Sequence, residues 1–126
     1  MKKDNKGFSL VELIIVIAIM AVLVGVLAPQ FIKYVEQSRR SRDITTAQEI
    51  REAVLADIAD GSLTGNGTVT NFTTLSTISE APVVSAKGLG SISFSASYNA
   101  KDGVCYVTCG TYTLTTESGA SQYKAA

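Results

Sequence analysis

The first half of the chain begins with a long apolar run. Residues 8–28 read FSLVELIIVIAIMAVLVGVLA, and only Ser9 and Glu12 among them are plainly polar. A helix of this length, with a rise of ~1.5 Å per residue, can cross a hydrocarbon core of ~30 Å. The pattern therefore predicts a membrane-spanning helix over residues 8–28.

The residues in front of this run predict its orientation. The residues before the apolar run carry a net positive charge, because Lys2, Lys3 and Lys6 outnumber the single acid Asp4. Cationic residues at the start of a membrane helix tend to stay in the cytoplasm. The run also exceeds the ~7–15 apolar residues of an ordinary secretory signal peptide. We therefore expect a single-pass precursor in the cytoplasmic membrane, with its N-terminus in the cytoplasm and everything after residue 28 outside.

Beyond Pro29 the helical period continues, but the apolar positions now alternate with charged ones. The apolar positions are Ile32, Val35, Ala47, Ile50, Val54 and Ile58. Asp60 followed by Gly61 is a helix stop signal, because glycine takes the left-handed conformation at low steric cost. Residues 29–60 are thus predicted to be the amphipathic half of the same helix. We expect a kink at Pro29, where one backbone donor is missing.

Residues 61–126 predict a small β-rich head. Residues 61–90 are rich in Gly, Ser and Thr and are interpreted as a loop. Alternating apolar and polar residues predict strands, with turn signals between them. The strands are expected at residues 91–98, 104–109 and 111–116, separated by a turn at residues 99–103 and by a bulge or turn at Gly110. The predicted fold class is α+β, a long N-terminal helix packed against a small C-terminal antiparallel sheet.

Composition argues against several classes of function. The chain has 126 residues, 11 basic against 11 acidic side chains, and no His. A neutral chain without a long basic run is a poor match for nucleic acid as the main partner. The lack of His removes the commonest metal ligand and acid–base group at neutral pH, so we expect no cofactor, no metal and no enzymatic activity. The charges of Arg39, Arg40, Arg42 and Asp43 have two interpretations, a subunit contact or a solvated helix face, of which the solvated face is the commoner.

One motif at the start of the apolar run is specific. The residues KGFSLVE, from Lys6 to Glu12, lead directly into the apolar helix. They closely resemble the processing site of prepilins in the type IV pilin superfamily. Pro29, about two-thirds of the way along the apolar stretch of the family, agrees with this resemblance. The resemblance covers roughly the first thirty residues, whereas the chain from Gly61 onward resembles nothing that we can place.

The resemblance implies a processing route and a set of partners. A prepilin peptidase would remove residues 1–7 by cutting after Gly7 and would methylate the new amine on Phe8. The product would polymerise with other copies of itself into a cell-surface pilus, aided by a membrane platform protein and an assembly ATPase. Independently of the family, Gly7 suits a cleavage site because glycine bends easily into an extended, cleavable conformation.

Glu12 is the residue that most needs an explanation. A carboxylate inside an apolar helix costs ~2.5 kcal/mol or more on membrane insertion scales, and such a residue is by default functional. A natural partner is the ammonium group that cleavage creates on Phe8 of a neighbouring copy, and this contact would set the register between subunits. The alternative interpretation is that Glu12 lies near the cytoplasmic end and extends to the lipid headgroups.

Cys105 and Cys109 leave two interpretations open. An exported domain with two cysteines suggests a disulfide bond. Two residues four apart in a regular strand are ~13 Å apart, whereas a disulfide needs Cα atoms within ~7 Å. A bond would therefore need a turn or bulge between Tyr106 and Thr108, and without one the cysteines are free thiols.

Four functions agree with this sequence to different degrees. The leading hypothesis is a structural pilin that builds type IV pili for adhesion, twitching motility or aggregation. A second hypothesis is a pseudopilin of a type II secretion or competence system. A third, from a different class, is an extracellular binding module tethered to the membrane, which predicts an intact leader and no filament. An enzyme is the weakest hypothesis, because no base and no paired acids recur in one place.

Overall fold

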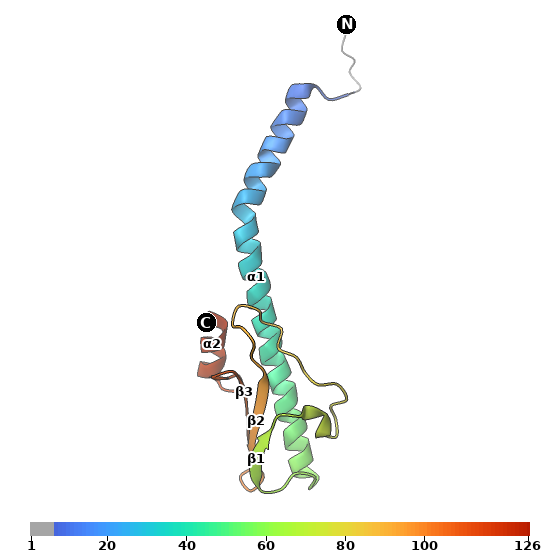
Figure 1. Cartoon of the computed structure of the whole chain (residues 1–126), viewed down its shortest axis with the longest axis vertical. Helices are drawn as coiled ribbons and strands as arrows, with labels where there is room; N and C mark the ends of the chain where they lie inside the picture. Colours follow the sequence, from blue (N-terminus) through green and yellow to red (C-terminus); the bar gives the residue numbers. More distant parts are fainter. Residues whose placement is uncertain (1–6) are drawn as a thin grey trace. The chain divides into compact units, whose positions relative to one another are not determined.

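The computed structural model describes residues 7–126, so the predicted leader, apart from Gly7, lies outside the described residues. The elements are one long helix, a sheet of four strands and two short helices (Figure 1). They are α1 (Leu10–Ala59), β1 (Asn66–Val69), the 3₁₀ helix η1 (Phe72–Thr74), β2 (Phe94–Asn99), β3 (Val104–Cys109), β4 (Tyr112–Thr113) and α2 (Glu117–Ala125). The predicted α+β class, with a long N-terminal helix and a small antiparallel sheet, is confirmed. The chain divides into two compact units, one that ends at Val35 and one of Glu36–Ala126, and each is described by itself.

The sheet of the second unit is antiparallel throughout and has the strand order β1-β2-β3-β4. In its centre Ala96 faces Val107 across the β2–β3 pair and Val69 across the β1–β2 pair. The β2–β3 turn contains Gly103 at a φ of +68°, and the β3–β4 turn contains Gly110 at +64°. Both values lie in the left-handed region that glycine adopts without steric cost, so the two predicted turns form where glycine allows them.

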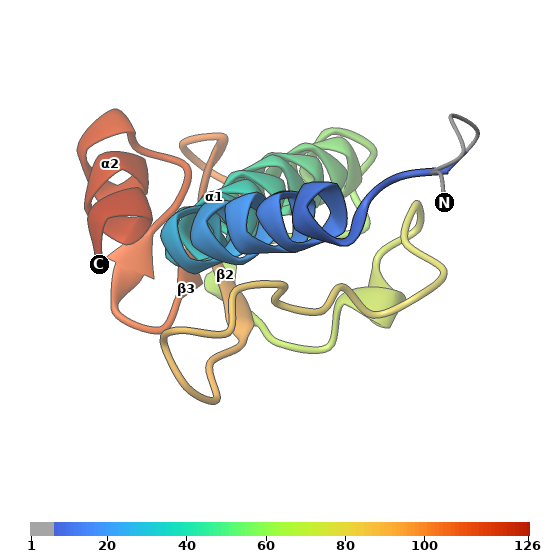
Figure 2. The ribbon, with the colours of Figure 1, turned by 90° about the horizontal axis from the view of Figure 1, so that it is seen from above.

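The second half of α1 packs on this sheet. In Figure 1 the sheet lies to the left of the second half of α1 and the start of the loop between β1 and β2 lies to its right, and Figure 2 shows the sheet and this loop from above. Inward positions of β3 alternate with outward ones, so that Cys105, Val107 and Cys109 are buried. The core cluster combines residues of every layer: Ala47, Ile50, Ala53, Val54, Phe72, Leu75, Ala86, Phe94, Ala96, Cys105, Val107, Cys109, Leu114 and Tyr123. Full burial of a side chain such as Ile50 or Val54 stabilises the fold by ~1.5–3 kcal/mol.

The helix ends where the sequence predicted. α1 stops at Ala59, and Gly61 adopts a φ of +86°. The amide of Gly61 donates to the carbonyl of Ile58 at 3.2 Å, and the amide of Leu63 donates to that of Asp57 at 3.1 Å. These bonds satisfy carbonyls that the last turn of a helix leaves without partners.

Three details of the head differ from the prediction. Residues 61–90 are not all loop, because β1 forms an edge strand and η1 a short turn of helix. The third strand is only Tyr112–Thr113 rather than residues 111–116, and helix α2 follows it. The hydrophobic pattern did not predict α2, because this helix is polar and buries only Gly119 and Tyr123. Its local signal is Thr116, whose hydroxyl accepts the amide of Gly119 as an N-cap.

Gly119 gives a test of how α2 packs. A Cβ atom at this position would lie 2.0 Å from the carbonyl oxygen of Thr113 and 2.7 Å from Oγ1 of Thr116. We predict that Gly119→Ala lowers the free energy of unfolding by about 1–3 kcal/mol, despite the better helix propensity of alanine. The matched control is Ser118→Ala, which changes an exposed neighbour in the same helix. Urea unfolding of the full chain in detergent, followed by tyrosine circular dichroism, measures both, and equal stability of the two variants would contradict the packing.

Candidate functional site

The segment of the predicted processing site lies just before α1. Gly7 and Phe8 precede the first helical residue, Leu10, and both are exposed. Phe8 keeps 79% of its surface accessible. A peptide bond outside a helix is free to enter an extended conformation in a protease active site, because it has no helical hydrogen bonds to break. The geometry therefore leaves the Gly7–Phe8 bond open to a peptidase.

Ser9 and Glu12 cap the start of the helix. The hydroxyl of Ser9 accepts the amide of Glu12 at 3.2 Å, and the carboxylate of Glu12 accepts the amide of Ser9 at 3.3 Å. This reciprocal pair is a capping box, which satisfies two of the amides that the first turn leaves without partners. The S-x-x-E spacing was visible in the sequence, but its capping role was not predicted. Within one chain, Glu12 is thus bound to its own backbone.

The apolar part of α1 is exposed in the part of the chain that the structure describes. Its most apolar window has a mean hydropathy of 3.1, and none of that window is buried. Leu13, Ile14 and Val16, for example, each keep 50% of their surface exposed. By length and composition this helix can cross a membrane, and its exposure separates it from the buried core helix of a soluble protein. Pro29 lies inside α1, which continues as helix on both sides of it, and the kink stays a prediction.

The two cysteines lie in one strand. Cys105 and Cys109 are both in β3, where the structure leaves them as free, buried thiols without the turn that a disulfide would need. Burial raises the pKa of Cys105 to about 11, although the nearby charge of Arg51 opposes this rise. Burial likewise raises the pKa of Cys109, and a contact with Tyr123 opposes it. A thiol that stays protonated is a poor nucleophile, so these residues act as core side chains.

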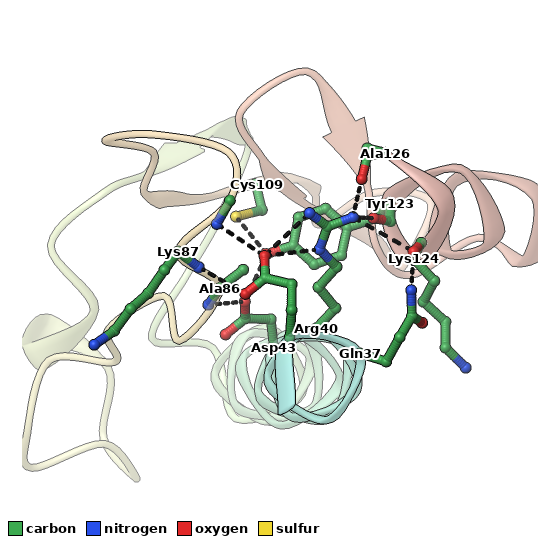
Figure 3. A network of polar contacts seen from close by, with 11 residues as sticks. Gln37, Arg40, Asp43, Ala86, Lys87, Cys109, Tyr123, Lys124 and Ala126 are labelled. Atoms are coloured by element: carbon green, nitrogen blue, oxygen red, sulfur yellow. Dashed lines mark hydrogen bonds and ion pairs between the residues drawn. The ribbon is translucent and has the colours of Figure 1, made fainter. Parts of the chain in front are cut away.

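A second constellation of charged groups lies in the head, around Asp43 (Figure 3). Asp43 is fully buried and accepts the hydroxyl of Tyr123 at 2.5 Å and the amides of Ser85 and Ala86 at 2.6 and 2.9 Å. The thiol of Cys109 completes the chain of contacts by donating to the hydroxyl of Tyr123 at 3.8 Å. A buried carboxylate is tolerated when hydrogen bonds replace its hydration, and here three donors do so.

Arg40 connects this network to the end of α2. Its guanidinium donates to the carbonyls of Tyr123 at 3.2 Å, of Lys124 at 3.4 Å and of Ala126. Gln37 adds a bond to the carbonyl of Lys124 at 2.8 Å. Carbonyls at a helix C-terminus lack intrahelical partners and carry partial negative charge, so a cation there is favourable. The interpretation of Arg40 and Asp43 as a solvated face is therefore wrong.

Glu36 extends the network to the loop before β2. It accepts the amides of Lys87 and Gly88 at 3.1 and 2.8 Å and pairs with Arg40 at 3.0 Å. Partial burial by itself would raise the pKa of Glu36, but the two amides and Arg40 outweigh that effect and lower the pKa below its ordinary value. The carboxylate therefore stays ionised and keeps the loop attached.

The polar side chains of this network bond to one another and to the backbone of the head. No buried side-chain nitrogen or oxygen lacks a hydrogen-bond partner in the part of the chain that the structure describes. Across residues 7–126, no group of three metal-ligating side chains comes together. Burial, together with the bond to Asp43, raises the pKa of Tyr123, so its hydroxyl remains a donor and not a base.

Comparison with known proteins agrees with the first site. The family model for the prokaryotic N-terminal methylation motif matches residues 2–28. The chain is 37% identical over 65 residues to a type IV major fimbrial protein FimA of Dichelobacter nodosus, a stretch that covers 52% of this chain and 42% of that protein. It is 41% identical over 66 residues to a probable minor fimbrial protein of the same organism, covering 52% and 42% respectively.

These matches leave much of both chains uncompared. This chain covers less than half of the length of the fimbrial relatives. No solved structure matches it. The likeness therefore concerns about half of this chain.

The contacts of Glu36 predict how stability depends on pH. Because its pKa is lower in the folded chain than the ordinary value of 4.5, ionised Glu36 stabilises the fold above that pH, and the contribution is lost as the pH falls through the folded-state value. The difference in unfolding free energy between the unaltered chain and Glu36→Gln should be constant from about pH 6 to 8 and shrink below about pH 4.5.

Urea unfolding at a series of pH values measures this difference. Glu80→Gln is the matched control, because Glu80 is an exposed carboxylate of the same loop region with no side-chain hydrogen bond among the described residues. A difference for Glu36→Gln that does not change with pH, or that grows on acidification, would contradict the assigned contacts.

Proposed function

We propose that this chain belongs to the type IV pilin family and is a structural subunit of a type IV pilus. In this proposal residues 1–7 are removed by cleavage after Gly7, and the new amine of Phe8 is methylated. The subunit then leaves the membrane and polymerises through its N-terminal helix into a surface filament for adhesion, motility or aggregation. The further partners are a prepilin peptidase, an assembly platform protein and an ATPase.

The observation that carries the proposal is the exposure of the apolar half of α1 within residues 7–126. Every large apolar side chain from Leu10 to Leu27 keeps half or more of its surface exposed. Exposed apolar surface on this scale needs lipid or another protein. A precursor that sits in the membrane and later bundles its helix with those of other copies meets this need in both states. The processing motif at Gly7 and Phe8 marks the step between the two states.

The capping box of Ser9 and Glu12 refines the proposed part of Glu12 in assembly. In the single chain, the carboxylate of Glu12 has one backbone amide as its partner. In the filament, the ammonium of Phe8 from a neighbouring copy would add a charged partner. A contact of opposite charges at ~4 Å is worth roughly 4 kcal/mol at an effective dielectric of about 20, before the cost of desolvation. The cap would keep the helix start in place while the neighbour docks.

Two other functions stay in view. A pseudopilin of a secretion or competence system would share the processing and the helix but build a shorter filament. The relative named as a major fimbrial protein favours the pilus over these systems. A membrane-tethered binding module would keep its leader and remain monomeric.

The first test is the mass and N-terminal sequence of protein that is sheared from the surface of the native host. We expect a chain that begins with methylated Phe8, because both processing and assembly must precede shearing. A chain that still begins at Met1 and stays with the membrane would overturn the proposal and favour the tethered module.

The second test separates the charge of Glu12 from its capping role. Gln can accept the same amide at this position of a capping box, so Glu12→Gln keeps the cap and removes the charge. We predict that Glu12→Gln reaches the membrane but yields at least about tenfold less filament, as expected for losing 1.4 kcal/mol or more per contact. Ser9→Ala, which weakens the cap and keeps the charge, should assemble. Normal filament from Glu12→Gln would refute the charge contact.

A further inference from the structure

The second half of α1 has an exposed face that its own domain leaves uncovered. The members of this outer stripe are small or polar and recur every three or four residues, which places them along one side of the helix. They are Ser38, Ser41, Arg42, Thr45, Gln48, Glu49, Glu52, Ala56 and Ala59. The opposite side carries buried residues such as Asp43, Ile50 and Val54. The stripe lies wholly within the second unit.

The stripe carries opposite charges at different heights. Arg42 lies near the N-terminal end of the stripe. Glu49 and Glu52 lie further along the helix, one turn apart from each other. Within residues 7–126 the one ion pair is Glu36–Arg40, so none of these three side chains has an ion-pair partner among the described residues. Arg42 and Glu49 are seven residues apart, or about 10 Å along the axis, which is beyond the three- or four-residue spacing at which side chains of one helix pair.

Nothing in the head covers this charged surface. Two shallow grooves, of about 490 and 370 Å³, run beside the stripe, between α1 and the loop of residues 77–85. Glu49 lines both grooves, Arg42 lines the larger and Glu52 the smaller. The charged side chains are thus open to a neighbour. The small residue Thr45, which lies between Arg42 and Glu49, leaves room for a second helix to approach at the usual ~8–10 Å.

We infer that the outer stripe binds a second copy of this chain, parallel to the first and displaced along the helix axis, with Arg42 of one copy between Glu49 and Glu52 of the next. A displacement of seven to ten residues, or ~10–15 Å, brings these charges level. The contact is heterologous, so the same displacement repeats from copy to copy without closing and generates a filament. Because the stripe has two acidic side chains and one basic side chain, its net charge is negative. It is therefore a poor surface for nucleic acid or anionic lipid.

This inference rests on the proposed function, and it adds the axial register of the second half of the helix. The contact of Phe8 with Glu12 would fix the register at the apolar end, whereas the contact of Arg42 with the two acids fixes it beside the heads. Both are charge contacts, but the second lies nearer to solvent. It should therefore weaken more as ionic strength rises.

Charge reversal in the full chain tests the pairing. Arg42→Glu makes the three charges of the stripe negative, and the double variant Glu49→Arg with Glu52→Arg makes them positive. We expect each variant alone to yield about tenfold less sheared filament than the unaltered chain, and coexpression of the two in one cell to restore the filament. In the mixed filament each copy finds a neighbour of opposite charge. Lys101→Glu, an exposed charge reversal in the β2–β3 turn, is the matched control and should assemble normally.

The outcomes separate the inference from the proposed function. Urea unfolding of each variant in detergent first shows whether its head is folded as in the unaltered chain. With folded heads, normal filament from Arg42→Glu alone would overturn the inference, and so would a failure of coexpression to restore filament. If the unaltered chain and Lys101→Glu also form no filament, the proposed function itself is refuted.

Discussion

Three carboxylates of α1 hold the loop of the head in place, and the rest of the second unit depends on them. Glu36, Asp43 and Asp57 are spaced by multiples of seven residues, so they lie close to one line on the helix. Each accepts main-chain amides of the stretch between η1 and β2, which contains no helix or strand. A loop that forms no backbone hydrogen-bond ladder of its own needs other acceptors for its main-chain amides. Here the carboxylates of α1 are those acceptors. Because Asp43 also accepts the hydroxyl of Tyr123, the same line of acids fixes α2.

This arrangement divides one continuous helix between two tasks. The second half of α1 supplies the core, the acids and Arg40, and its own head covers most of that surface. The first half presents exposed apolar side chains on every side. A filament subunit needs both properties, because the head must stay folded outside the membrane while the helix exchanges lipid for other copies. The outer stripe is the one side of the second half of α1 that the head leaves open.

Elements with a strong hydrophobic period were predictable from the sequence, and elements held by polar contacts were not. The period and Gly61 predicted α1 and its end, and the alternation in β2 and β3 predicted the central hairpin. α2 was missed because its sequence, ESGASQYKA, has a single large buried side chain, Tyr123, so no period could show. Asp43 was misread because it follows three arginines, although its spacing of seven from Ile50 placed it on the buried side. The processing motif was recognisable because it depends on local sequence, whereas the capping role of Glu12 became clear from the bonds to Ser9.

The most direct measurement is the folding of residues 29–126 without the apolar segment. This account holds that the head and the second half of α1 form a complete folding unit and that the first half serves contacts outside the subunit. The shortened chain should therefore be soluble, keep the tyrosine circular dichroism of the full chain and unfold in one cooperative transition. A shortened chain that is unfolded, or that folds only when residues 8–28 are restored, would contradict the division of the helix on which the account rests.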